Sequence, residues 1–248
     1  MAAALRLADE DAGATSAPGG VLGGADSIRV PLQLSWRYRN PGLLVAERLG
    51  IDPPRQSLYT VMGGNLVQRL VNETGRDIVA GRNDLVLITG AEAWRTRTHT
   101  KRSGTTLDWT HQDDDVPLAE TYGRDEMLLS PHEMERGIVL PVQVYPMFET
   151  ALRAAAGEGV DEHQVRISEL WSRFSDVAAT NPHAWSRRAM TAEEIRTPSP
   201  TNRMVGLPYT KYMNSNNDVD MAAAIIVCSA EKAASMGVPR DRWVFVRA

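Results

Sequence analysis

The stretch of residues 57–90 constrains the fold most, because two apolar strand candidates flank an amphipathic helix within it. SLYTVM (57–62) predicts a short strand, GGN (63–65) a tight turn, and LVQRLVNETGRDIVA (66–80) a helix with one apolar face. DLVLITG (84–90) is dominated by Val, Ile and Leu, which is typical of a strand buried on both faces. A strand, a helix and a second strand in this order favour a parallel sheet. We therefore predict an α/β fold.

No strand candidate precedes the first predicted helix. Residues 2–11 predict a short helix, and the segment 14–24, rich in Gly, predicts a loop. A second helix begins with Asn40 as its cap and Pro41 at its first position, and it ends at Gly50. A βαβ architecture in this order begins without its first strand. We expect either a chain that starts late in its fold or a start assigned within a longer gene.

The middle of the chain is polar at first and then helical. Residues 91–125 lack periodicity and predict a long loop or insertion. SPHE (130–133) has the form of a capping box, MFETALRAAAG (147–157) ends another helix, and residues 161–180 predict a third. We therefore expect a mainly helical middle region.

The last part of the chain returns to strand and helix patterns. MAAAIIVCS (221–229) predicts a buried strand, and AEKAASM (230–236) a short helix that stops at Gly237. RWVFVRA (242–248) predicts a final strand. A domain that finishes on an uncovered strand indicates a missing element or a partner that covers it.

Length and composition narrow the protein class. A chain of 248 residues allows one large domain or two smaller ones and excludes a small disulfide scaffold. Its net charge of −4 is too small to indicate a nucleic acid or an anionic membrane as partner. No apolar run is long enough to cross a bilayer, and the acidic start differs from a secretion signal. The single cysteine fits a reducing compartment, so we predict a cytoplasmic protein.

Residues 60–93 resemble the nucleophile region of the thiolase superfamily in layout: strand, turn, helix ending in I-x-x-G, strand, then G-x-E. The matching positions are Ile78, Gly81, Gly90 and Glu92. Residues 218–239 are similar to the family's D-G-A-A-A strand and the A-x-x-x-G helix after it. The resemblance implies the N-terminal half of a thiolase fold, a layered α/β structure with a parallel-rich sheet and a mainly helical loop domain.

The resemblance also implies a domain organisation. Residues 1–92 form the first part of the thiolase N-terminal domain, and residues 93–214 form the loop domain on the coenzyme A side. Residues 215–248 are the return of the chain to the N-terminal domain.

The family's nucleophile is a cysteine at the start of the helix after the turn, where the helix dipole favours a thiolate. Counting back from Ile78 places that cysteine on Gly64, which cannot be acylated. We therefore expect no catalytic residue in this chain. The family's N-E-A-F-A, G-H-P and C-G-G motifs belong to a C-terminal half that is not in this sequence.

Gly63-Gly64-Asn65 resembles an unusual turn found in the sterol-carrier-type branch of the superfamily. Backbone N–H groups at the start of a helix attract anions, so the turn predicts the floor of an anion or oxyanion pocket. A plain strand-to-helix turn capped by Asn65 is the alternative.

The resemblance implies coenzyme A or acyl-CoA as ligand and no prosthetic group. The irregular stretch before residue 221 approaches the pantetheine arm in the family and supplies the candidate contacts. These are Arg203, Tyr209, Lys211 and Asn216, the last at the position of a family serine. A basic run after the second strand of the motif is a further candidate for phosphate contact, with a solvent-exposed charge cluster as the alternative. The run consists of Arg95, Arg97, His99, Lys101 and Arg102.

The remaining candidates for chemistry are a cysteine and two acidic segments that contain histidine. The acidic segments are His111 with Asp113, Asp114 and Asp115, and His132 with Glu133 and Glu135. Neither has a spacing that brings metal ligands to one face, so we predict no metal site. Cys228 lies within an apolar strand candidate, which predicts inert packing.

These observations lead to hypotheses of different classes. The first is an acyl-CoA acyltransferase of the acetyl-CoA acetyltransferase type, degenerate or incomplete as an isolated chain. The second is a non-catalytic acyl-CoA-binding module, and the third is a thiolase-fold lyase of steroid side-chain breakdown that works with a small β-rich partner. In each case we expect self-association, a C-terminal thiolase half or a partner subunit, because half of a pseudo-symmetric fold exposes an apolar face.

Overall fold

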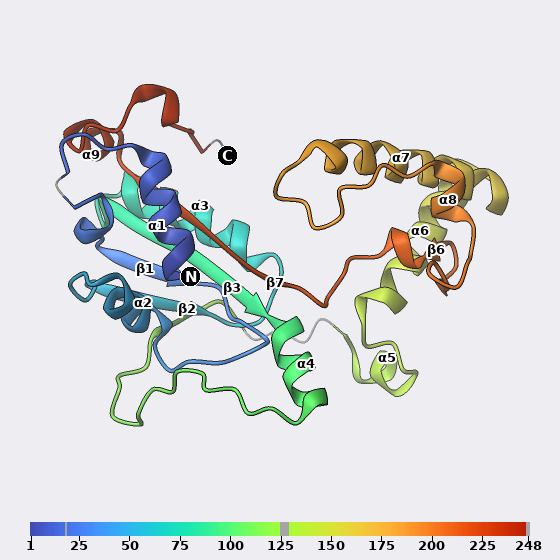
Figure 1. The fold of residues 1–248 in the computed structure, drawn as a ribbon, viewed down its shortest axis with the longest axis horizontal. Coiled ribbons are helices and arrows are strands. Elements are labelled where there is room, and N and C mark those ends of the chain that lie inside the picture. Colours follow the sequence, from blue (N-terminus) through green and yellow to red (C-terminus); the bar gives the residue numbers. More distant parts are fainter. Residues whose placement is uncertain (18, 125–128, 247–248) are drawn as a thin grey trace. The chain divides into compact units, whose positions relative to one another are not determined.

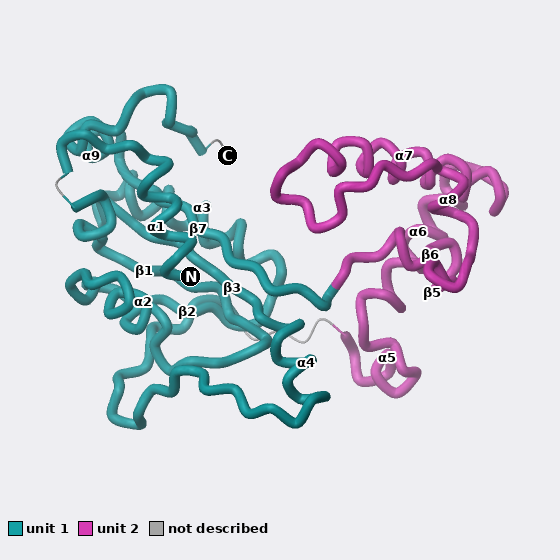
Figure 2. Tube along the Cα trace, in the orientation of Figure 1, with its two compact units in different colours: residues 1–126, 217–248 teal, residues 127–216 magenta. Residues whose placement is uncertain are grey.

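The computed structural model describes residues 1–17, 19–124 and 129–246. The chain forms two compact units (Figure 2). Unit 1 comprises Met1–Glu126 and Asn217–Ala248, and unit 2 comprises Met127–Asn216. Each unit has its own core.

Unit 1 is built on a five-stranded sheet with the strand order β4-β2-β1-β3-β7. The strands are β1 (Ser27–Val30), β2 (Gln56–Thr60), β3 (Leu85–Ala93), β4 (Glu120–Tyr122) and β7 (Asp220–Cys228). β1 pairs in parallel with β2 and β3, β4 pairs in parallel with β2, and β7 pairs antiparallel with β3. The predicted α/β class and the parallel-rich sheet are confirmed.

Helices cover both faces of this sheet (Figure 1). They are α1 (Ala2–Ala12), α2 (Pro41–Leu49), α3 (Leu66–Val79) and α9 (Ala230–Ser235). Helix α4 (Trp94–Ser103) follows the end of β3 and has no buried residue. Alternate residues of a strand point to opposite faces. Leu85 and Leu87 therefore join the core under α1 and α2, whereas Val86 and Ile88 join the core under α3.

Local signals in the sequence define several of these helix ends. The Asn40 side chain accepts the amide of Leu43 at 3.1 Å, and Pro41 occupies the first turn of α2. Gly50 ends that helix with a φ of 71°, a left-handed conformation that glycine adopts without strain. The predicted boundaries of α2 are confirmed.

The first forty residues contain a strand that the sequence pattern did not indicate. β1 lies at the centre of the sheet with all four residues buried, although Ser27 and Arg29 make its sequence too polar to be recognised as a core strand. As predicted, no strand precedes the first helix, α1. Arg29 is tolerated in β1 because polar groups brought by tertiary packing satisfy its guanidinium.

Two other predictions from sequence pattern need correction. Residues 91–125, expected as a loop, contain the end of β3, helix α4 and strand β4. The segment 242–248, expected as a strand, is not one over its described residues, which end at 246. There Arg240 stacks on the ring of Trp243 with 4.2 Å to its centroid, and the Trp243 indole donates to the Val238 carbonyl at 3.0 Å. These local contacts replace strand pairing.

The segment 93–124, which the sequence assigned to the loop domain, packs within unit 1. The Gln112 amide donates to the Asn40 carbonyl at 2.9 Å, and the Thr96 hydroxyl donates to Asp220 at 2.7 Å. These contacts tie the segment to α2 and β7.

Unit 2 is mainly helical, as predicted. Its elements are α5 (Pro131–Glu135), α6 (Pro141–Ala156), α7 (Val160–Thr180), α8 (Ala192–Arg196), β5 (Met204–Gly206) and β6 (Tyr209–Thr210). Ser130 and Glu133 form the predicted capping box. Ile167, Ile195 and Met213 form the core of the unit. Within the described residues, no helix is long and apolar enough to cross a membrane.

Candidate functional site

The turn Gly63–Asn65 connects β2 to the N-terminus of α3, as the sequence predicted. The Leu66 amide donates to the Gly63 carbonyl at 3.1 Å, which closes the turn. Asn65 occupies the N-cap position, but its side chain accepts no capping hydrogen bond from the described residues. Gly64 and Asn65 are exposed, so the start of α3 faces solvent within unit 1.

The backbone at Gly64 has room for a side chain. A Cβ built there meets no described atom within 4 Å, and φ at Gly64 lies outside the left-handed region. At Gly63, by contrast, a Cβ would lie 2.9 Å from the Asn65 side-chain oxygen. The absence of a nucleophile at position 64 is therefore a property of the sequence and is not imposed by the fold.

A buried ion pair anchors the helix that carries this turn. The guanidinium of Arg29 donates to the Thr74 hydroxyl at 2.9 Å and to the Asp77 carboxylate. Arg82 donates to the same carboxylate at 2.8 Å. Burial alone would raise the pKa of Asp77, but hydrogen bonds from Arg29 and Arg82 outweigh it and hold the pKa below its ordinary value. This network attaches α3 to the central strand.

Glu92, the glutamate of the G-x-E motif, ties the end of β3 to the loop after β1. Its carboxylate accepts the amides of Leu34 and Ser35, the latter at 3.0 Å. The Ser35 hydroxyl accepts the Ala93 amide at 3.1 Å. Glu92 therefore fixes a loop, and its carboxylate is occupied by backbone donors.

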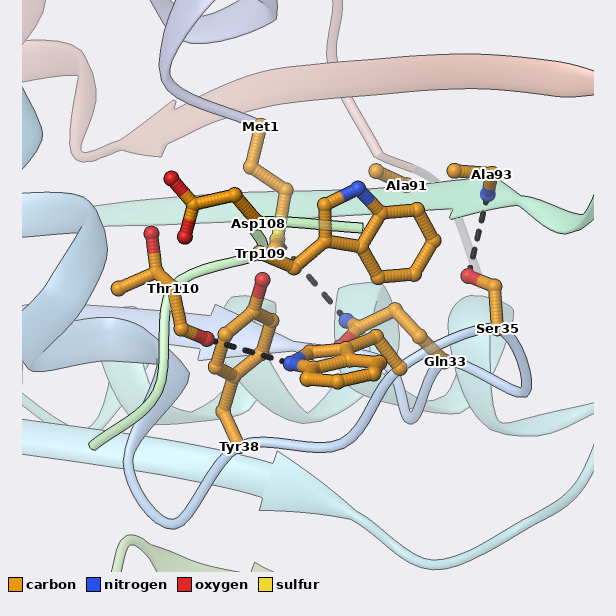
Figure 3. A pocket seen from close by; sticks show the side chains of 10 residues that line it. Met1, Gln33, Ser35, Tyr38, Ala91, Ala93, Asp108, Trp109 and Thr110 are labelled. Carbon is orange, nitrogen blue, oxygen red and sulfur yellow. Dashed lines mark hydrogen bonds between the residues drawn. The ribbon is translucent and has the colours of Figure 1, made fainter. Parts of the chain in front are cut away.

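That loop lines an aromatic pocket of about 240 Å³ within unit 1 (Figure 3). Its lining combines indole and phenol rings with short polar side chains: Met1, Gln33, Ser35, Trp36, Tyr38, Ala91, Ala93, Asp108, Trp109 and Thr110. The Trp36 indole donates to the Thr110 carbonyl at 3.2 Å, and its ring meets Trp109 edge-on at 5.1 Å. Sequence reasoning missed this pocket because its lining comes from four parts of the chain that lie far apart: residue 1 and residues 33–38, 91–93 and 108–110.

The predicted coenzyme A contacts lie in unit 2, on the β5–β6 hairpin and on the residues that flank it. The Lys211 amide donates to the Arg203 carbonyl at 2.9 Å, so these two exposed residues are neighbours along their backbones. The Tyr209 hydroxyl donates to Glu149, and burial together with this carboxylate raises the pKa of Tyr209. Asn216 is exposed at the end of the unit. The structure thus brings Arg203 and Lys211 together, whereas the Tyr209 hydroxyl already donates to Glu149 of the same unit.

The basic run forms helix α4. All five members of the run are exposed: Arg95, Arg97, His99, Lys101 and Arg102. Arg97 donates to the Leu34 carbonyl at 3.0 Å and lies 5.4 Å from the Trp94 ring centroid. Within unit 1, α4 therefore presents the basic run as a solvent-exposed charge cluster, which was the alternative to phosphate contact.

The other candidates for chemistry are held by packing or by local pairs. Among the described residues, no group of three potential ligands has the arrangement of a metal site. His111 packs against Trp36 at 5.0 Å, and His132 lies 3.6 Å from Glu135. Cys228 is half-buried on β7, and burial raises the pKa of its thiol, in line with inert packing.

Unit 2 also contains a buried histidine that sequence reasoning did not single out. The imidazole of His163 lies between Glu158, 2.6 Å from one ring nitrogen, and Glu149, 2.8 Å from the other. Arg166 donates to Glu158 at 2.6 Å. Both ring nitrogens of His163 therefore face carboxylate oxygens. The cluster joins α6 to α7.

Comparison with known proteins gives matches at the level of structure. No protein-family model and no curated protein matches the sequence. The chain is similar to a monomeric SCP2-thiolase-like protein type 1 from Mycobacterium smegmatis, with a TM-score of 0.75 and 30% identity over 99% of this chain and 45% of that chain. It shares its fold with an Ltp2-ChsH2(DUF35) aldolase, with a TM-score of 0.54 and 19% identity over 85% of this chain and 46% of that chain. The chain thus spans less than half the length of these solved structures.

Proposed function

We propose that this chain, which belongs to the thiolase-like superfamily, binds coenzyme A or acyl-CoA without forming an acyl-enzyme. The observation that carries the proposal is Gly64, which stands at the start of α3 where a family nucleophile is expected. The backbone leaves room for a side chain at that position, but glycine supplies none. Cys228, the single cysteine of the chain, does not replace it because the thiol is half-buried and its pKa is raised by burial.

The β5–β6 hairpin supports the binding part of the proposal. Arg203 and Lys211 are exposed and adjacent, and the phosphates of coenzyme A are the groups that two such cations attract. Tyr209 contributes its partly exposed ring, since its hydroxyl already donates to Glu149. We expect Asn216 to act as a hydrogen-bonding contact to the pantetheine arm.

Titration calorimetry of the whole chain with coenzyme A and acetyl-CoA tests the binding. We expect the variant R203A/K211A to weaken binding about tenfold, because it removes two charge-assisted contacts. The matched control is R173A/R187A, which removes the same charge from exposed positions of the same unit and should change the affinity less than twofold. Absence of binding at millimolar ligand would refute the proposal.

Intact mass spectrometry tests the second part. After incubation with acetyl-CoA, we expect the mass of the chain to be unchanged, because no acyl acceptor stands at position 64. A stoichiometric acetyl adduct removed by hydroxylamine would show that Cys228, the single cysteine, forms a thioester, and it would contradict the proposal that no acyl-enzyme forms.

The fold shared with the Ltp2-ChsH2(DUF35) aldolase favours a second candidate, a lyase that works with a small partner domain. Carbon–carbon cleavage that begins with proton transfer from a hydroxyl needs no cysteine, so Gly64 is compatible with it. Co-expression with a DUF35 domain and release of a ketone from a β-hydroxyacyl-CoA test this candidate. Failure to co-purify with the domain would remove it.

A further inference from the structure

The aromatic pocket of unit 1 contains a carboxylate and no basic side chain. Of the ten residues that line the pocket, only Asp108 has a charged side chain. Asp108 is exposed, and its carboxylate forms no hydrogen bond or ion pair with the described residues. The amino group of Met1 is the one positive charge among the lining residues, and burial lowers its pKa. The charge of the Asp108 carboxylate is therefore available to a ligand.

Three aromatic rings form walls of this pocket: Trp36, Tyr38 and Trp109. The two indoles have centroids 5.1 Å apart and planes at 86°, so they form adjacent walls and do not stack on each other. The Met1 side chain points toward the same space as the rings of Tyr38 and Trp109 (Figure 3). Aromatic ring faces carry a partial negative charge, and the thioether of methionine is polarizable. Such walls attract a cation without hydrogen bonds.

The polar side chains of the lining already bond to protein groups. Gln33 donates to a backbone carbonyl at 2.7 Å and accepts a tyrosine hydroxyl at 3.2 Å. The Ser35 hydroxyl accepts the Ala93 amide at 3.1 Å, and the Thr110 hydroxyl accepts from the exposed Arg48 at 3.0 Å. A ligand rich in hydroxyl or N–H groups would lose its hydrogen bonds to water and gain few in return. The pocket therefore favours a ligand that contacts the rings through methyl groups.

The walls are held in place by contacts within the protein. The Trp36 indole donates to the Thr110 carbonyl at 3.2 Å, and Glu92 accepts the backbone amides of Leu34 and Ser35 in the same loop. Walls that are ordered before binding reduce the entropic cost of binding. The volume of about 240 Å³ is below the range of about 300–1,000 Å³ found for drug-sized ligands. The pocket thus fits a small head group better than a long acyl chain.

We propose that this pocket binds the quaternary ammonium group of a small ligand, a trimethylammonium compound, against the rings of Trp36, Tyr38 and Trp109 with Asp108 as counter-ion. Such a group has a positive charge, a surface of methyl groups and no hydrogen-bond donor, which are the properties that the lining matches. This inference goes beyond acyl-CoA binding and does not depend on it, because the pocket lies in unit 1 and the predicted coenzyme A contacts lie in unit 2.

Titration calorimetry of the whole chain with choline chloride, at constant ionic strength, is the first test. The comparison ligand is the carbon analogue of choline, in which a tert-butyl group replaces the trimethylammonium group. We expect choline to bind at least about tenfold more tightly, because only the cation interacts with the ring faces and with Asp108. Equal affinities, or no binding of choline up to about 50 mM, would overturn the proposal.

Two variants test the residues that form the site. Trp109→Leu keeps an apolar wall and should weaken choline binding at least about fivefold, whereas Trp185→Leu, an exposed tryptophan of unit 2, should not. Asp108→Asn should weaken choline binding about threefold, whereas Asp115→Asn, an exposed acid of the same segment, should not. Because Asp108 is exposed, its variant stays informative if Trp109→Leu does not fold. Unchanged affinity in both Trp109→Leu and Asp108→Asn would overturn the proposal.

A trimethylammonium group occurs in free compounds and in lipid head groups. Sedimentation with phosphatidylcholine vesicles distinguishes these two sources. We expect the chain to stay in the supernatant, because the rings of the pocket are only partly exposed and so do not reach into a lipid surface. Retention on the vesicles without binding of free choline would overturn the assignment to a small ligand.

Discussion

Replacing Asp77 by asparagine removes the negative charge that neutralises the buried Arg29. The side chain of Arg29 is 1% exposed and that of Asp77 is 12% exposed, so water does not replace the lost partner. Leaving one member of a buried ion pair uncompensated costs about 3–5 kcal/mol. Because the Thr74 hydroxyl still accepts from Arg29 at 2.9 Å, we expect the lower end, about 3 kcal/mol.

Hydrogen exchange measured by mass spectrometry as a function of urea gives the free energy of unfolding of unit 1 by itself. Peptides from α3 report on the helix that Asp77 anchors. A loss of about 3 kcal/mol corresponds to exchange about a hundredfold faster in Asp77→Asn than in the unchanged chain. The control is Glu73→Gln on the same helix, whose partner Arg76 is 70% exposed, and it should change stability by less than about 0.5 kcal/mol.

The contribution of Asp77 to the stability of unit 1 should depend on pH in a defined direction. The pKa of Asp77 is lower in the folded state than its ordinary value, so its contribution is complete above the unfolded pKa of about 4. The contribution is lost as pH falls through the folded pKa. The difference between the unchanged chain and Asp77→Asn should therefore shrink in acid. Equal stabilities of Asp77→Asn and Glu73→Gln at neutral pH would refute the assignment of a buried pair.

Three further predictions concern separate parts of the chain. Gly64→Cys on a Cys228→Ser background should fold without measurable loss of stability, since a Cβ at position 64 meets no described atom within 4 Å. Iodoacetamide should alkylate this new thiol faster than it alkylates Cys228 of the unchanged chain. Slower alkylation would contradict an open N-terminus of α3. His163→Gln should raise hydrogen exchange in α7 about tenfold, because glutamine cannot contact both Glu149 and Glu158 as the imidazole does. The exposed control His183→Gln should leave the exchange unchanged. Asn40→Ala should destabilise α2 by about 1 kcal/mol through the lost cap to Leu43, as measured by exchange in α2 peptides; an unchanged rate there would show that the cap does not contribute.

The match between sequence and structure is best where a signal is local. The Asn40 cap and the Ser130 capping box are formed by residues three apart, so their positions follow from the sequence alone. The apolar run of β3 and the amphipathic pattern of α3 predicted both elements, with boundaries within a few residues. The mainly helical character of the middle region was also evident, but its boundary was not, because residues 93–124 are placed by contacts with α2 and β7.

The candidate site divides in the same way. Gly64 at the start of α3 follows from counting along the motif, and the absence of a nucleophile there is a fact of sequence. The room for a side chain at that position depends on backbone geometry. The hydrogen bond from the Tyr209 hydroxyl to Glu149 joins residues 60 positions apart, so no pattern within the hairpin reveals it.

By itself the sequence determined the α/β class, the unit of β2, α3 and β3, and the missing thiol at position 64. Only the tertiary structure decided that the polar segment Ser27–Val30 is the central strand. A buried arginine is stable only with partners, and those of Arg29 lie 45 and 48 residues away on α3. The aromatic pocket and the His163 cluster likewise arise from residues that folding brings together, because burial and pairing are set by neighbours in space and not by neighbours in the chain.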